Sequence, residues 1–359
     1  LHPIPFDSFT DPEARLRRRS TDLLVHPDQM QNLRLRTAVI KALRARLDAE
    51  GFLEVETPIL HTVHGGASAR PFRTYINAYG EDLTLRIAPE LYLKRLVVGG
   101  SGPVYELGRD FRNEGADATH NPEFTVLEAY RPYADYAQMR ELTERLIKDA
   151  AQSVFGSVSL PLGRRASSER TVSDVSGPWR VVSVCDALSE ALGRRVDVQT
   201  DFEELLALAQ QYGVRVHEGM GPGAIVEELY GELVEAHTVE PTFYTDFPAE
   251  TSPLAAPHRS VPGLAERWDL VINGMEMGCA YSELADPLVQ RERLTEQSLK
   301  AASGDLEAME VDEDFLYALE TGMPPTGGLG LGVDRLVMLL AQTQIRGVLS
   351  FPFVKPERS

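Results

Sequence analysis

The chain has 359 residues, of which 43% are hydrophobic, so it can bury a large core, and one large domain with an insert is the simplest organisation. No apolar run approaches the length of a membrane span, and the start of the chain lacks a signal-peptide pattern, so the sequence predicts neither feature. The formal net charge of −18 argues against a surface that binds nucleic acid through many basic residues.

The two cysteines, Cys185 and Cys279, lie far apart in the sequence. They form no Cys-x-x-Cys pair, which argues against a disulfide framework and against a zinc site, and they fit a reducing cytoplasm. Because the first residue is leucine, we expect the chain to be a fragment or a trimmed protein.

The N-terminal part is expected to begin with a linker and an entry helix over residues 1–33. The basic run at residues 15–19 is interpreted as the solvated face of a helix. A helical stripe follows, Gly51 ends it, and residues 52–57 alternate as a strand before Pro58. The stripe consists of Val39, Ile40, Leu43 and Leu47.

A strand, a charged loop and a second strand are predicted over residues 104–130, with the strands at residues 104–107 and 124–130. In this hairpin Arg112 can neutralise a phosphate, and Glu114 can accept a hydrogen bond from an adenine amine. His120 can reach phosphate oxygens, and Phe124 offers a face for a base to stack on. The pattern favours a nucleotide-handling device; the alternative is a polar loop with a surface ion pair.

The middle of the chain is predicted to be largely helical. A helix is expected through Met139, Leu142, Leu146 and Ile147, and residues 183–238 carry further apolar stripes at helical spacing. The polar residues 164–177, rich in Ser and Arg, are interpreted as an exposed loop. Strands resume at residues 242–247 and 268–272.

Glycines alternate with apolar residues at 328–332, directly before an apolar helical run at 336–340. Glycine at alternate positions lets the backbone approach a ligand, because a Cβ there would collide with it. Arg335 lies at the junction of strand and helix, where a guanidinium can bind a terminal phosphate. The run contains neither a G-x-G-x-x-G fingerprint nor a Gly-Lys-Ser/Thr ending, so no dinucleotide or Walker loop is predicted.

The charged hairpin and the glycine-rich run resemble motifs 2 and 3 of class II aminoacyl-tRNA synthetases, and the helix and strand before Pro58 resemble motif 1. Lysyl-tRNA synthetases in particular are similar at residues 64–72, 85–94, 123–130 and 281–284. The resemblance implies an α+β class II synthetase core, in which helices flank an antiparallel sheet of about six or more strands.

The same resemblance implies a domain organisation. The catalytic domain would occupy residues 34–359, with a helical insertion between motifs 2 and 3 at about residues 183–238. Residues 1–5 resemble the linker that follows an N-terminal OB-fold domain, which is expected to be absent from this chain. The acidic net charge would then have two explanations: the absent domain binds the tRNA, or the acidic balance favours a cationic amino acid.

The implied reaction has two steps and needs no protein nucleophile. The carboxylate of L-lysine attacks the α-phosphate of ATP to give lysyl-adenylate and pyrophosphate, and the 3′ end of tRNA(Lys) then accepts the lysyl group. The catalytic residues would be Arg112, bridging the lysine carboxylate and the α-phosphate, and Arg335, binding the γ-phosphate. Phe124 and Arg335 would sandwich the adenine. The other implied ATP-binding residues are Glu114, His120, Asn121, Asp269 and Glu276.

Asp269 and Glu276 are the implied ligands of Mg²⁺. They lie seven residues apart with Asn273 and Gly274 between them, as on adjacent strands of a hairpin. Carboxylates together with phosphates suit this ion. Some family members have Glu where Asp269 stands, and we expect the shorter side chain to shift the metal without abolishing its binding.

Selection of lysine is implied to depend on negative charge at the end of a deep pocket. Glu128, Tyr130 and Glu283 match the positions that hold the ε-ammonium, and Glu90 and the backbone carbonyl of Gly66 match those that hold the α-amino group. For Glu128 and Glu283 taken singly, the alternative is a salt bridge to an arginine in the core.

Two pocket positions depart from the family. Cys279 stands where Asn usually helps Arg112 to hold the lysine carboxylate, and a thiol is a poor hydrogen-bond donor. Tyr281 stands where Phe is common. We expect weaker lysine binding than in a housekeeping enzyme, with unchanged specificity at the ε end.

Residues 257–260 and 266–270 resemble two-domain actinobacterial proteins that fuse a lysyl-tRNA synthetase to a membrane lysyl-phosphatidylglycerol synthase. In that case the lysyl-tRNA would also supply lipid modification, and the full-length protein would carry a membrane domain beside this cytoplasmic part. Motif 1 implies a homodimer, since an exposed apolar segment such as residues 39–60 is unfavourable in a monomer.

Two alternative functions remain open. The first is an elongation factor P–lysine ligase, which activates β-lysine and passes it to a protein lysine; Gly330 disfavours it, because that family usually has Ala at this position. The second is a non-catalytic, amino-acid-binding paralogue. It is disfavoured by the joint presence of Arg112, Glu114, Phe124, Glu276 and Arg335.

Overall fold

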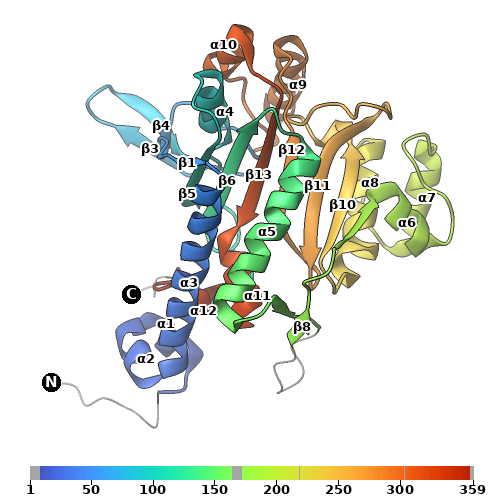
Figure 1. Ribbon diagram of the computed structural model, residues 1–359. Coiled ribbons are helices and arrows are strands. Elements are labelled where there is room, and N and C mark those ends of the chain that lie inside the picture. The colour runs from blue at the N-terminus through green and yellow to red at the C-terminus, as the bar shows by residue number, and fades with distance from the viewer. Residues whose placement is uncertain (1–8, 164–171, 218, 303, 356–359) are drawn as a thin grey trace.

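The computed structural model describes residues 9–163, 172–217, 219–302 and 304–355, and its centre is an eight-stranded sheet (Figure 1). In sheet order the strands are β1 (Leu53–Glu54), β5 (Val104–Phe111), β6 (Glu123–Pro132), β13 (Thr326–Gly332), β12 (Met275–Ser282), β11 (Leu264–Ile272), β10 (Thr242–Pro248) and β9 (Arg180–Ser183). Neighbours from β5 to β10 are antiparallel, while the edge strands β1 and β9 pair in parallel. The antiparallel class II core predicted from the sequence is confirmed.

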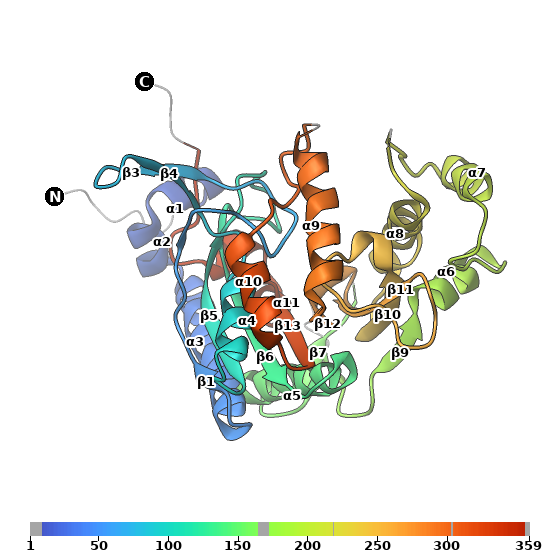
Figure 2. The same ribbon diagram turned by 90° about the horizontal axis from the view of Figure 1, so that it is seen from above.

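Helices cover both faces of this sheet. On one face lie α3 (Pro27–Ala49), α5 (Tyr136–Phe155) and α11 (Val333–Ala341), whose apolar side chains join those of the strands in the main core. Figure 2 shows α8 (Pro222–Leu233) and α9 (Pro287–Ala302) across the sheet from α5. On that second face α4 (Glu90–Val98) packs against β5 and β6, and α10 (Glu313–Gly322) packs against α4.

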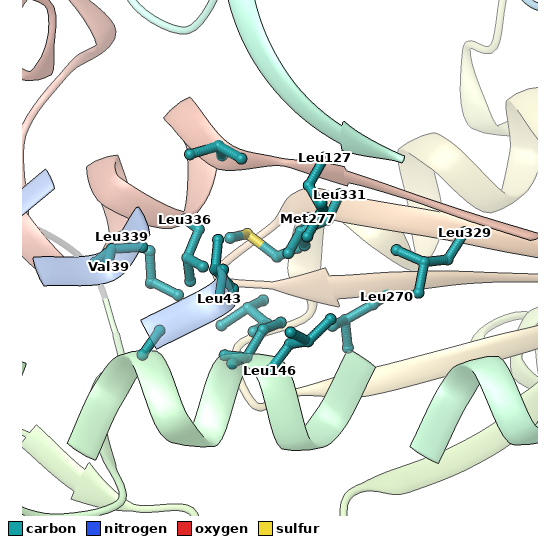
Figure 3. Packing of buried hydrophobic residues seen from close by; sticks show 14 of the residues in the cluster. Val39, Leu43, Leu127, Leu146, Leu270, Met277, Leu329, Leu331, Leu336 and Leu339 are labelled. Carbon is teal, nitrogen blue, oxygen red and sulfur yellow. The ribbon is translucent and has the colours of Figure 1, made fainter. Parts of the chain in front are cut away.

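The two-residue period of the strands assigns one face to the core and the other to the site. Leu127, Leu329 and Leu331 are buried in the main core, where Figure 3 shows them with Leu146 of α5. The residues next to them in sequence, Glu128 on β6 and the glycines of β13, therefore face the opposite side. In the alternating run of β13 the leucines thus face the core, and the glycines face the side on which a ligand can bind.

The helices on the core face form where the apolar spacing predicts them. Asp135 and Gln138 make a capping box at the start of α5, and Gly156 ends it in the left-handed region with φ of 71°. In α3, Val39, Leu43 and Leu47 are fully buried within the chain's own core.

The motif 1 segment differs from the expectation in two respects. Only Leu53–Glu54 of the predicted strand at residues 52–57 pairs as a strand. Val39, Leu43 and Leu47 of the helix stripe are buried and Ile40 is partly buried; the exposed apolar side chains of this segment are instead Leu53, Ile59 and Leu60, with 54%, 44% and 49% of their surface exposed.

The predicted helical region at residues 183–238 is confirmed. It contains α6 (Val184–Leu192), α7 (Phe202–Tyr212), α8 and the 3₁₀ helix η1 (Glu235–His237). These helices have a core of their own, which packs against Tyr244 and Phe247 of β10 and Val271 of β11. The domain boundary expected after residue 33 falls within α3.

The remaining elements are short. A small sheet is formed by β2 (Leu60–His61), β4 (Glu81–Leu85) and β3 (Arg73–Ile76), and the 3₁₀ helix η2 (Ala249–Thr251) follows β10. β8 (Val172–Asp174) pairs with β7 (Ser159–Pro161), so the expectation of a loop at residues 164–177 is wrong for β8, and residues 164–171 lie outside the described part. In the described ranges, no helix combines the length and apolar character needed to cross a bilayer.

The N-terminal helices α1 (Pro12–Arg17) and α2 (Arg19–Val25) are attached to the C-terminal segment that follows α12 (Ile345–Val348). Arg19 is buried, pairs with Asp22, and donates to the carbonyl oxygens of Leu349 and Ser350, each at 3.1 Å. The prediction of a solvated basic face is therefore wrong for Arg19. Residues 1–5, interpreted as a linker, lie outside the described residues.

Candidate active site

A cavity of about 380 Å³ lies over β6, β13 and β12, on the sheet face that points away from the main core. Of the site residues predicted from the sequence, Asp269 alone is absent from its lining. The structure thus brings the rest together: Gly66, Glu90, Arg112, Glu114, His120, Asn121, Phe124, Glu128, Tyr130, Glu276, Cys279, Tyr281, Glu283 and Arg335.

The glycines of β13 make room for the side chains of the cavity. A Cβ added at Gly328 would overlap Glu283 Oε1 and lie 2.5 Å from Tyr130 Cε1. At Gly330, by contrast, the only neighbour of an added Cβ among the described atoms is Glu128 Cγ, at 4.0 Å. Gly328 is therefore required by the packing of the pocket, whereas Gly330 keeps space open above the sheet.

Two arginines and an aromatic ring form the part of the cavity predicted to bind ATP. The guanidinium carbon of Arg112 lies 5.2 Å from the centre of the Phe124 ring, and Arg112 Nε is buried without a hydrogen-bond acceptor among the described residues. Arg335 Nη1 donates to the carbonyl oxygen of Glu276 at 2.7 Å and lies 3.6 Å from its carboxylate. A buried guanidinium donor without an acceptor favours binding of an anion.

The loop between β5 and β6 forms the mouth of this part. His120 pairs with Asp117 at 2.9 Å, and backbone N–H groups of Thr119 and His120 help to lower the pKa of that carboxyl. Asn121 accepts a hydrogen bond from the backbone N–H of Phe353. Both His120 and Glu114 are exposed, so they stand where a bound nucleotide can reach them without rearrangement of the core.

The part of the cavity predicted to bind lysine contains a carboxylate without a cationic partner. Glu128 is buried and accepts a hydrogen bond from Tyr130 at 3.0 Å, but it makes no ion pair with the described residues. Burial, together with the nearby Asp110, raises the pKa of Glu128 well above its ordinary value. A bound ammonium would reverse this effect, because it stabilises the ionised carboxylate.

The other two glutamates share a partner that sequence reasoning missed. Lys94 of α4 is fully buried, and its Nζ lies 2.6 Å from Glu90 Oε1 and 2.5 Å from Glu283 Oε2. The alternative of a salt bridge in the core therefore holds for Glu283, with a lysine in place of an arginine. The spacing of Glu90 and Lys94, four residues apart on a helix, was the available signal.

Asp110 of β5 was missed as well. Its carboxylate is buried in the wall of the cavity, 3.0 Å from Arg86 Nε, and burial raises its pKa to about 6. Arg86 also pairs with Glu106 at 2.5 Å, so one cation serves two carboxylates. No motif marked Asp110, because the strand pattern alone does not show which charged residue turns inward.

The predicted magnesium ligands lie on one hairpin, as expected. Asp269 is on β11 and Glu276 on β12, joined by the turn at Asn273 and Gly274, and Arg267 pairs with Asp269 at 2.8 Å. Burial raises the pKa of Asp269 to about 7, and the charge of Glu276 adds to this.

These two carboxylates fit a cation that is shared with phosphates. In the described part of the chain, no three His, Cys, Asp or Glu side chains cluster closely enough to hold a metal ion. Mg²⁺, however, commonly takes only one or two protein carboxylates and completes its shell with phosphate oxygens and water. Asp269 and Glu276 therefore suit Mg²⁺ that arrives with ATP.

Cys279 and Tyr281 continue the wall along β12. The Cys279 sulfur lies 3.6 Å from the Tyr281 hydroxyl, and burial raises the pKa of both groups. Cys279 is therefore a neutral thiol rather than a thiolate, and it faces Gly330 across the β12–β13 pair.

The chain is similar to known proteins over nearly its whole length. Residues 11–355 match the family described as "tRNA synthetases class II (D, K and N)". The chain is 55% identical to the lysylphosphatidylglycerol biosynthesis bifunctional protein LysX of Nocardia farcinica, over 99% of this chain and 32% of that protein. LysX of Mycolicibacterium vanbaalenii is 56% identical, with the same two coverages. LysX of Mycobacterium tuberculosis is 53% identical, over 99% and 31%. The chain spans about a third of the length of the curated relatives it matches.

Proposed function

The chain belongs to the class II tRNA synthetases of the D, K and N group, and from this we propose that it is a lysine-tRNA ligase domain, which activates L-lysine with ATP and transfers the lysyl group to tRNA(Lys). The name of its relatives refers to lysylphosphatidylglycerol biosynthesis, which supports lysine as the amino acid. The same name supports use of the lysyl-tRNA for lipid lysylation in the full-length protein.

The observation that favours lysine as the amino acid is that Glu128 is a buried carboxylate without a cationic partner among the described residues. This carboxylate is buried in the cavity, has Tyr130 as its hydrogen-bond donor, and pairs with no cation of the described chain. Burying an uncompensated carboxylate is unfavourable, and the ε-ammonium of a bound lysine would remove that penalty. An amino acid with a neutral side chain would leave the penalty in place, so the pocket favours a cationic substrate.

Activation would depend on positioning and on charge. Arg112 lines the cavity next to Phe124, and its guanidinium would hold the amino-acid carboxylate against the α-phosphate. Arg335 would bind the γ-phosphate and cover one face of the adenine, while Phe124 covers the other. The α-amino group would be held by Glu90 and the carbonyl of Gly66.

Asp269 and Glu276 would hold Mg²⁺, which neutralises part of the charge on the phosphates when bound. In the structure each of these carboxylates is next to an arginine, Asp269 to Arg267 and Glu276 to Arg335. Binding of ATP would therefore give Arg335 a phosphate partner and make Glu276 available for the metal ion.

Assembly of a homodimer through the motif 1 segment is part of this proposal. Leu53, Ile59 and Leu60 are exposed there, although apolar side chains of this size are normally buried. A two-fold contact over this segment would cover them.

Amino-acid-dependent ATP–pyrophosphate exchange, measured with L-lysine, β-lysine and arginine, tests the proposal. We expect exchange with L-lysine only, followed by transfer of labelled lysine to tRNA(Lys). A preference for β-lysine would instead support the elongation factor P–lysine ligase. Absence of exchange with all three, while ATP still binds, would support a non-catalytic protein.

A further inference from the structure

We propose that Lys94 is a positioning residue that sets the charge of the lysine pocket, so that with L-lysine bound the pocket places two negative charges against the two ammonium groups of the substrate. This inference rests on the proposed function, because it concerns how the same cavity selects its substrate. It is carried by the position of Lys94 behind two carboxylates that face the cavity.

Lys94 is held on several sides without touching the cavity. Its ammonium pairs with Glu90 Oε1 and Glu283 Oε2, and it lies 5.9 Å from the centre of the Phe315 ring of α10. The side chain is fully buried, and Lys94 is not among the residues that line the cavity. A ligand there would meet Glu90 and Glu283, with Lys94 behind them, so Lys94 acts through these two carboxylates.

The three glutamates that face the ligand match its two ammonium groups in charge only when Lys94 is included. A bound lysine favours the ionised form of Glu90, Glu128 and Glu283, and Lys94 then neutralises one of their three charges, which leaves two. L-lysine has two ammonium groups, and its carboxylate is assigned to Arg112. The other titratable groups facing these glutamates are Asp110, Tyr130 and Tyr281. Asp110 pairs with Arg86, which also pairs with Glu106, and the charge of Asp110 adds to the raised pKa of Glu128.

Lys94 also determines which oxygens remain for the ligand. It occupies Oε1 of Glu90 and Oε2 of Glu283, while Glu283 Oε1 is buried and accepts no hydrogen bond from the described residues. Burial opposes the charge of Lys94, but Glu283 and Glu90 outweigh it and raise the pKa of Lys94, so the ammonium remains charged. Each of the two glutamates thus keeps one oxygen free while its negative charge is shared.

Loss of Lys94 is expected to increase the number of protons released when lysine binds. In a Lys94→Met protein three buried carboxylates would repel one another, and one more of them would be protonated before lysine binds. Binding of the substrate's two ammonium groups would then expel that proton. We expect Lys94→Met to release about one proton more per bound lysine than the unchanged protein, because linkage equates the change in protonation with the pH dependence of binding.

The experiment is titration calorimetry of L-lysine binding at pH 8.5, repeated in two buffers of different ionisation enthalpy. Burial raises the pKa of Glu283 to about 8, so at pH 8.5 this carboxylate is more ionised in the unchanged protein than at neutral pH. Protons exchanged by lysine itself are common to both proteins and cancel in the difference. The dissociation constant of L-lysine should rise at least roughly tenfold in Lys94→Met, because binding must remove the proton from a carboxyl whose pKa is raised. Each unit by which that pKa is raised corresponds to a factor of ten in the equilibrium constant.

The chain offers a matched control in Lys148 of α5. Its Nζ lies 2.6 Å from Glu144, also four residues away on the helix, and 5.6 Å from the centre of the Trp179 ring. Lys148→Met therefore removes a similar ion pair and ring contact outside the cavity. It should lower stability without changing the proton count or the affinity for lysine.

Three results would overturn the inference for different reasons. If the unchanged protein does not bind L-lysine, the proposed function is wrong and the inference falls with it. If it binds lysine but Lys94→Met shows the same affinity and proton count, the role given to Lys94 alone is wrong. Should Lys94→Met not fold, Lys94→Met combined with Glu283→Gln restores two negative charges, and it should release no more protons than the unchanged protein; one extra proton there would also overturn the inference.

Discussion

Arg36 of α3 forms an ion pair with Asp334 of α11, and this pair connects the three sequence motifs of the site. Arg36 Nη2 donates to Thr125 Oγ1 at 2.8 Å, and the backbone N–H of Thr125 donates to Asp334 Oδ2, also at 2.8 Å. Thr125 follows Phe124, and Asp334 precedes Arg335. The two residues expected on either side of the adenine are therefore positioned by one network that is anchored on the motif 1 helix.

The substitution Arg36→Gln should lower both stability and ATP binding. Asp334, with 4% of its side chain exposed, would lose its cation, which is expected to cost about 3 kcal/mol in the free energy of unfolding. The KM for ATP should rise, because Phe124 and Arg335 lose their common support. Urea denaturation and pyrophosphate exchange measure the two effects.

Arg44, on the same helix, provides the control for Arg36. Its ion pair with Glu54 is exposed, with 44% and 40% of the two side chains accessible, so Arg44→Gln should cost less than about 1 kcal/mol. Equal losses in the two variants, or an unchanged KM for ATP in Arg36→Gln, would contradict the role of the network.

The ligand-free protein should become less stable as the pH rises from 5.5 to 8.5. The pKa of Asp110 is raised to about 6, that of Asp269 to about 7 and that of Glu283 to about 8, in each case first by burial. In this window the folded protein holds more protons on these groups than the unfolded chain does. Their stabilising contribution is therefore complete below the ordinary carboxyl pKa and is lost as the pH passes the raised values.

Glu128 is the sharpest test of this pH dependence, because burial and Asp110 raise its pKa and no ion pair opposes them. Glu128→Gln cannot ionise, so its free energy of unfolding should fall less between pH 5.5 and 8.5 than that of the unchanged protein. The exposed Glu141, changed to Gln, should leave the slope as it is. A slope unaffected by Glu128→Gln would show that this carboxyl is ionised in the free protein.

The helices and many of the strands follow from local patterns in the sequence, whereas most of the cavity residues were expected only from the resemblance to lysyl-tRNA synthetases. Apolar spacing predicted α5 and the inserted helices, and the glycines at alternate positions of β13 were interpreted as a place where the backbone approaches a ligand. Lys94, Asp110 and Arg267 were not predicted, since each depends on which side chains meet after folding. A strand or helix pattern shows the face of a charged residue but not its partner on another element.

The two glycines Gly328 and Gly330 should respond differently to alanine. Gly328→Ala would place a methyl group against Glu283 and Tyr130, and overpacking of this kind is expected to cost about 1–3 kcal/mol and to impair lysine binding. Gly330→Ala has room for its methyl group, so its stability should change by less than about 1 kcal/mol.

The methyl group of Gly330→Ala would instead project into the lysine part of the cavity, toward Glu128. We expect a higher KM for L-lysine in pyrophosphate exchange and a smaller ratio of L-lysine to β-lysine activity. Denaturation curves separate the two variants. A stable Gly330→Ala protein with an unaltered ratio would show that this position does not select between the two amino acids.

Cys279→Asn should tighten lysine binding. Cys279 lines the cavity and faces Gly330 across the strand pair, so the longer amide has room to extend toward the carboxylate held by Arg112. A hydrogen bond to a charged group contributes about 1.5–3 kcal/mol, which predicts a KM for L-lysine lower by roughly tenfold or more. Cys279→Ala, which removes the thiol without adding a donor, should leave the KM near its original value.

Cys185→Asn introduces the same amide on α6, away from the cavity, and should have no effect on KM. An unchanged KM in Cys279→Asn would mean that Arg112 holds the carboxylate without help from β12. A drop shared by the asparagine and alanine variants would instead attribute the gain to loss of the bulky sulfur. Only a gain confined to the asparagine shows that the thiol deprives the pocket of a hydrogen-bond donor.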